Sequence, residues 1–137
     1  MKKIDVVAAI IIHNHQILCM QRGKGKFDYI SNKYEFPGGK IEAGESPTEA
    51  LIREIEEEME ILIDEKMTTP YLTIEHQYPD FFIRMHSFLC PVDSRHFTLT
   101  EHIDYKWMSR NELNLLDWAP ADIPIVERLM GDTDIES

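Results

Sequence analysis

The chain contains 137 residues, of which 43% are hydrophobic and 28% are charged, and these proportions are ordinary for one globular domain. Its 25 acidic and 14 basic side chains give a net charge of −11. This excess of acid argues against binding to a nucleic-acid polymer, because the phosphate backbone is bound by a basic face. No apolar run approaches the ~20 residues that span a bilayer, so a membrane is not expected as a partner either.

The N-terminal apolar run predicts a strand rather than a signal peptide. Val6–Ile12 is short, and it is followed by His13-Asn14-His15 instead of a small-residue cleavage site. Cys19 and Cys90 lie inside apolar runs, which is typical of reduced residues in a protein core. We therefore expect a cytoplasmic protein.

Apolar patterning predicts strands before and after one strongly marked helix. Val6–Ile12 is β-branched and continuously apolar, as in a strand that is buried on both faces, and Asn14-His15 predicts a turn into the next strand. Further strands are expected at residues 16–21, 71–78, 81–90, 97–99 and 105–108, with a two-residue stub at 35–36.

Capping residues mark the helices. Ser46-Pro47-Thr48-Glu49 is a capping box with proline at the first helical position, which predicts a helix from Pro47 to Glu60. Two shorter helices are expected after a second capping box at Ser109, to about Leu115, and after an Asp122 N-cap, over Ile123–Met130. The order of elements predicts an α/β fold with a mixed sheet and helices on both faces. We expect one domain over residues 1–131 and a frayed acidic tail over residues 132–137.

A dense group of carboxylates follows a pair of glycines. Eight glutamates lie between residues 42 and 60, and Glu54, Glu57 and Glu58 are spaced to share one helical face. Such a group forms either a solvated acidic surface or a site for hard divalent cations, which prefer oxygen ligands. Gly38-Gly39 just upstream favours the cation site, because glycine lets a backbone approach a metal or a phosphate closely.

The spacing of these residues resembles the Nudix box, Gly-x5-Glu-x7-Arg-Glu-U-x-Glu-Glu-x-Gly-U, in which U is aliphatic. The matching run begins at Gly39, continues through Glu45 and Arg53, and departs from the pattern only at Glu60, where the family has glycine. Segments 32–42 and 118–124 resemble the MutT-like branch and its CTP pyrophosphohydrolase members. The resemblance implies a Nudix α/β/α sandwich with a central mixed β-sheet. We expect Glu60 to end the helix without the usual left-handed residue, at a small cost in stability.

The resemblance also implies a nucleotide pyrophosphohydrolase that acts on acid anhydrides with Mg²⁺, for which Mn²⁺ can substitute. The implied catalytic residues are Glu54, Glu57, Arg53 and Glu101, and the implied metal ligands are Gly38, Glu54, Glu57 and Glu58. Glu54 is implied to act partly as general base, and Arg53 to orient the glutamates. Glu101 stands six residues before Trp107, as in MutT relatives, although a lone loop glutamate is more often simply exposed.

The implied substrate is a small-molecule nucleoside triphosphate, bound through Arg22, Asp122 and Gly39 by a monomer or weak homodimer. Asp122 matches an asparagine of MutT that reads oxidised guanine. An ionised aspartate only accepts hydrogen bonds, which suits the cytosine N4 amine and favours CTP, dCTP or a modified cytosine nucleotide. The alternatives are 8-oxo-dGTP hydrolysis, which would need Asp122 protonated or a different pose, hydrolysis of a nucleotide sugar or dinucleotide, and a non-catalytic nucleotide-binding module.

Overall fold

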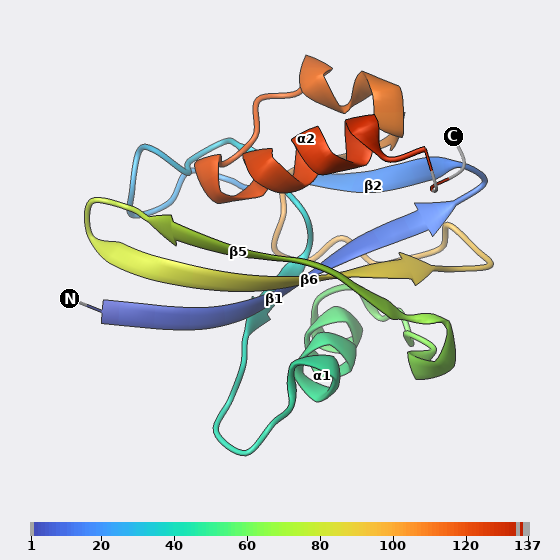
Figure 1. The fold of residues 1–137 in the computed structure, drawn as a ribbon, viewed down its shortest axis with the longest axis horizontal. Coiled ribbons are helices and arrows are strands. Elements are labelled where there is room, and N and C mark those ends of the chain that lie inside the picture. Colours follow the sequence, from blue (N-terminus) through green and yellow to red (C-terminus); the bar gives the residue numbers. More distant parts are fainter. Residues whose placement is uncertain (1, 134, 136–137) are drawn as a thin grey trace.

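The computed structural model describes residues 2–133 and 135, and it consists of a mixed sheet with helices on both faces (Figure 1). Helix α1 (Pro47–Met59) covers one face, and helix α2 (Ile123–Gly131) covers the other. The predicted α/β/α sandwich is therefore confirmed. Within the described residues, no helix has the length and apolar character of a membrane span. The frayed tail expected over 132–137 falls partly on residues 134, 136 and 137, which lie outside the described residues.

The strands of the described chain form one mixed sheet. Their bounds are β1 (Lys2–His13), β2 (Gln16–Gln21), β3 (Tyr34–Glu35), β4 (Gly38–Lys40), β5 (Thr69–Gln77), β6 (Phe81–Pro91) and β7 (Asp104–Ser109). The order is β3-β2-β1-β6-β5, and β4 and β7 pair with β1 and β2 respectively. Strands β1 and β6 are parallel, whereas the other pairs in the described sheet are antiparallel.

Strand β1 exchanges partners along one edge. Val6 to Ala8 pair with β4, and further along the same strand Ile12 pairs with Ile17 of β2. Asn14 and His15 form the tight turn between β1 and β2, with left-handed φ angles of 48° and 65°. This exchange places the end of β2, the short β3 and the glycines of β4 near one another.

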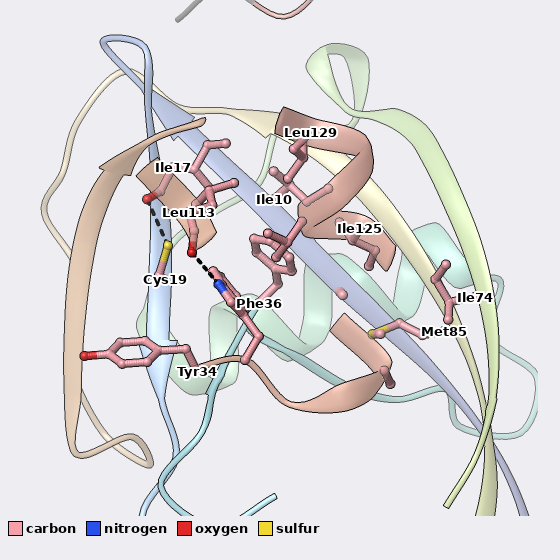
Figure 2. Close-up of a cluster of buried hydrophobic side chains, with 14 of the residues drawn as sticks. Ile10, Ile17, Cys19, Tyr34, Phe36, Ile74, Met85, Leu113, Ile125 and Leu129 are labelled. Atoms are coloured by element: carbon pink, nitrogen blue, oxygen red, sulfur yellow. Dashed lines mark hydrogen bonds between the residues drawn. The ribbon is translucent and has the colours of Figure 1, made fainter. Parts of the chain in front are cut away.

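Two separate cores explain why β1 is apolar at successive positions. Val7, Ala9 and Ile11 face the core under α1, whereas Ala8 and Ile10 face the core under α2. Figure 2 shows Ile10 in the second core together with Ile125 and Leu129 of α2 and with Phe36. Each fully buried aliphatic side chain contributes roughly 1.5–3 kcal/mol, so a polar residue on either face of this strand would weaken a core.

One predicted strand is absent, and one predicted helix is present without its predicted cap. The segment 97–99 forms no strand, because the amide of Thr98 donates to the carbonyl of Met59 at 3.0 Å instead of joining the sheet. The predicted helix after Ser109 is a 3₁₀ helix, Arg110–Leu115, and the Ser109 hydroxyl makes no capping hydrogen bond. At Thr98 a tertiary hydrogen bond therefore takes the amide that a strand would need.

Candidate active site

Helix α1 carries the acidic residues, and its start is fixed locally as predicted. The Ser46 hydroxyl accepts from the amide of Glu49 at 3.1 Å, and the Glu49 carboxylate accepts from the amide of Ser46 at 2.8 Å. The helix buries an apolar stripe that includes Ile55 and Met59. It ends at Glu60, which itself adopts the left-handed conformation with φ 57°, so the expected absence of such a residue is wrong. A left-handed residue with a Cβ costs about 1–2 kcal/mol.

Arg53 joins carboxylates from the helix and from the loop before it. Its Nε and Nη2 donate to the two oxygens of Glu45 at 2.6 and 2.9 Å, a bidentate pair. Its Nη1 donates to Glu54 at 2.9 Å and to Glu57 at 3.2 Å. The hydrogen bond from Arg53 lowers the pKa of Glu45. Three of the box carboxylates are therefore held in one cluster by a single guanidinium.

The two glycines of β4 are required by close contacts. A Cβ on Gly38 would lie 1.8 Å from the carbonyl oxygen of Val7, and a Cβ on Gly39 would lie 2.3 Å from Oε2 of Glu54. Gly38 has no room for a side chain because its neighbour is backbone, whereas a side chain at Gly39 would displace the Glu54 carboxylate. The glycines thus let β4 lie against β1 on one side and against the carboxylate of Glu54 on the other.

Glu58 is the buried member of the acidic helix. It is 9% exposed, and its Oε2 has no hydrogen-bond partner among the described residues. Burial raises the pKa of Glu58 to about 9, and a hydrogen bond with the Glu101 carboxyl adds to the shift, followed by the charges of Glu101, Glu35 and Glu54. Glu101 therefore lies beside α1 although it is 43 residues from Glu58 in sequence.

The donor set fits a divalent cation. A buried carboxylate oxygen without a partner, among other carboxylates, is stabilised when a cation replaces the missing hydrogen bond and offsets the repulsion. Among the described residues, no group of three acidic, histidine or cysteine side chains is arranged to bind a metal ion. Glu54 and Glu57 instead accept hydrogen bonds from Arg53. Cation binding would therefore require these two side chains to rotate.

A second part of the site is a largely apolar pocket of about 140 Å³, and Asp122 is one of the residues that line it. The carboxyl of Asp122 is 5% exposed and accepts from the amide of Phe36 at 3.2 Å. It makes no capping bond to α2, so its predicted N-cap role is wrong. Burial holds the pKa of Asp122 well above its usual range, and the charge of Glu35 adds to this shift. The protonated form both donates and accepts, whereas the sequence argument assumed an ionised, accepting form.

The apolar pocket adjoins a charged one. The charged pocket has a volume of about 320 Å³, and its lining includes Glu58, Glu101 and Lys24. Both pockets are also lined by Arg22, Glu35 and Gly38. Nη1 of Arg22 donates to Oε1 of Glu35 at 3.2 Å. This hydrogen bond holds the positively charged guanidinium where the two pockets meet. The site therefore combines an apolar end, a cationic junction and an end rich in carboxylates.

Comparison with known proteins agrees with this arrangement. A family model described as the NUDIX domain matches residues 2–129. The chain belongs to the Nudix family. It is 33% identical to an 8-oxo-dGTP diphosphatase of Escherichia coli (strain K12), with 94% of this chain and 98% of that protein covered. It is 36% identical to the CTP pyrophosphohydrolase of the same strain, with 96% and 94% covered. The solution structure of the E. coli ORF135 protein superposes with a TM-score of 0.80 at 34% identity, covering 95% of this chain and 90% of that one.

This Nudix hydrolase contains two site residues that the sequence argument did not single out. Glu35 lines both pockets, and its Oε2 lies 2.9 Å from Nε2 of His102, which lines the charged pocket. The available signals were weak: Glu35 lies in the MutT-like segment before Gly38, and His102 follows Glu101. Neither residue belongs to a periodic pattern or a spaced motif.

Proposed function

We propose that this Nudix hydrolase cleaves nucleoside triphosphates to the monophosphate and pyrophosphate with Mg²⁺, for which Mn²⁺ can substitute. The adjoining pockets are the observation that carries the proposal. A base suits the apolar pocket, while the polyphosphate suits the junction at Arg22 and the charged pocket beyond it. The names of the two curated relatives also support a nucleoside triphosphate substrate.

In this proposal Glu54, Glu57, Glu58 and the Gly38 carbonyl would hold the cation. When bound, the cation neutralises phosphate oxygens and makes water a better nucleophile for in-line attack. Arg53 holds the Glu54 and Glu57 carboxylates on the same side of α1. Either Glu54 or Glu101 accepts the proton of the attacking water as the bond between the α- and β-phosphates breaks.

Asp122 is the residue proposed to select the base. In its protonated form it presents a donor beside an acceptor, which matches N3 and the N4 amine of cytosine. This pairing supports CTP, dCTP or a modified cytosine nucleotide as the substrate.

A second candidate substrate, 8-oxo-dGTP, is favoured by the same raised pKa of Asp122. Oxidised guanine has an N7–H donor beside the O6 acceptor, and a protonated carboxyl complements this pair as well as it complements cytosine. Unmodified guanine presents two acceptors at these positions and would be bound less well.

A pyrophosphate-release screen with Mg²⁺ tests the proposal. The panel should contain CTP, dCTP, 5-methyl-dCTP, 8-oxo-dGTP and the common triphosphates, with ADP-ribose as an outgroup and Glu57→Gln as the inactive control. Selective turnover of cytosine nucleotides is the expected result. Preference for 8-oxo-dGTP would replace the base assignment, and binding of nucleotides without turnover would favour a non-catalytic binding module.

A further inference from the structure

The segment that carries Glu101 has no regular secondary structure, yet it is tied to the fold on both sides. Over residues 98–103 there is neither helix nor strand. The Thr100 hydroxyl donates to the carbonyl of Glu58 at 2.5 Å, at the end of α1. On the other side the amide of Ile103 donates to the carbonyl at the end of β2 at 2.9 Å. The segment therefore bridges the acidic helix and the strand that precedes Arg22.

His102 supplies an inward anchor between these two attachments. Its side chain is only 6% exposed, and its Nε2 lies 2.9 Å from Oε2 of Glu35. A carboxylate oxygen accepts hydrogen bonds, so the contact belongs to the His102 tautomer that carries its proton on Nε2. The other oxygen of Glu35 accepts from Arg22 at 3.2 Å. The Glu35 carboxylate thus joins the segment that carries Glu101 to the Arg22 guanidinium, where the two pockets meet.

The loop needs such an anchor because it has no regular structure of its own. Glu101 and Glu58 line the same pocket, and one oxygen of Glu58 has no hydrogen-bond partner among the described residues. Without the His102 contact, the loop between Thr100 and Ile103 would be free to turn Glu101 away from α1. Arg22 is 41% exposed, so without Glu35 its guanidinium would sample many rotamers in place of the one that lies between the pockets.

We propose that His102 and Glu35 are positioning residues, which together hold Glu101 beside Glu58 and Arg22 at the junction of the two pockets. This inference rests on the proposed function, because it assigns a task to residues of the same site. It predicts that the two residues act differently. Replacing His102 should affect metal binding and kcat alone. Replacing Glu35 should affect these and also the binding of the triphosphate.

The test compares His102→Leu, His102→Gln and Glu35→Ala with wild type. Asp117→Asn is the matched control, since the Asp117 carboxylate pairs with Lys33 at 2.8 Å, is 74% exposed and lines neither pocket. The readouts are kcat and KM for the nucleotide that the wild type prefers, and the dissociation constant of Mn²⁺ without nucleotide by electron paramagnetic resonance. Circular dichroism melting confirms that each variant is folded.

His102→Leu should lower kcat and weaken Mn²⁺ binding by roughly 10- to 100-fold while KM changes little, because it frees Glu101, which lines the same pocket as the proposed ligand Glu58. Losses of this size are typical for residues that support metal ligands. His102→Gln, which retains an N–H donor at similar reach, should recover most of both quantities. Glu35→Ala should show the same losses and also raise KM, because it releases Arg22. Asp117→Asn should match wild type.

Two results would overturn the inference. One is a folded His102→Leu variant with wild-type kcat and Mn²⁺ affinity, and the other is a His102→Gln variant no better than His102→Leu. If the wild type hydrolyses none of the nucleotides, the proposed function fails on its own. The Mn²⁺ affinities of the same proteins then decide the positioning role independently of turnover.

Discussion

Replacing Glu58 by glutamine should stabilise the metal-free protein in alkaline solution, although it removes a proposed metal ligand. Glu58 is buried, and one of its oxygens has no hydrogen-bond partner among the described residues. Its pKa is raised from 4.5 to about 9, so the folded protein keeps this carboxyl protonated over a pH range in which the unfolded chain ionises it. The unfolded state therefore binds fewer protons between these values, and the free energy of unfolding falls as the pH rises through them.

The size of this effect follows from the shift. One unit of pKa difference corresponds to about 1.4 kcal/mol. Between about pH 5 and about pH 8 the shift from 4.5 to about 9 lowers the free energy of unfolding by up to about 4 kcal/mol. Glutamine at position 58 has a similar shape and no charge to bury. We expect the advantage of Glu58→Gln over wild type to grow from near zero at about pH 5 to roughly 2–4 kcal/mol at about pH 8.

Urea unfolding in EDTA at several pH values measures this gain directly. Titration of the other groups is common to both proteins, so the difference between them isolates position 58. Glu57→Gln is the control, because Glu57 lies on the same helix but is 63% exposed and should show no comparable gain. A difference between Glu58→Gln and wild type that does not change with pH would refute the reasoning. So would a loss of stability in Glu58→Gln at the alkaline end.

Three further substitutions test other parts of the site. Asp122→Asn keeps a donor and an acceptor but does not titrate, so its KM should not change with the protonation of this side chain, whereas the wild-type KM should rise as the pH rises and Asp122 loses its proton; parallel KM profiles would contradict this. Gly38→Ala places a methyl group 1.8 Å from the backbone oxygen of Val7 and should lower the free energy of unfolding by roughly 2–4 kcal/mol; an unchanged melting temperature would contradict it. Arg53→Lys loses the bidentate pair with Glu45 and should lower kcat by roughly 10- to 100-fold in steady-state assays, so wild-type kcat would show that the pair orients nothing.

The features that were predictable from sequence are those whose causes lie within a few residues. Ser46 and Glu49 cap the helix through their own neighbours, and this start appears where the capping box placed it. The spacing from Gly39 to Glu58 identified the Nudix family, because the box is continuous in sequence. The continuously apolar β1 was predictable because burial on both faces leaves that pattern in any chain.

The wrong predictions concern groups that could form either a local or a long-range hydrogen bond. Asp122 is a residue type that often caps helices, but its carboxyl accepts a hydrogen bond from the amide of Phe36, 86 residues away. The segment 97–99 is apolar enough for a strand, yet apolar character does not state which surface will bury it, and here Thr98 joins the end of α1.

The sequence alone therefore determined the family, the fold class and the acidic helix. Only the tertiary structure decided the protonation of Glu58 and Asp122 and the link from His102 through Glu35 to Arg22. The reason is physical. A pKa and a hydrogen bond depend on the groups within a few ångströms, and in a folded chain most of those groups come from other segments.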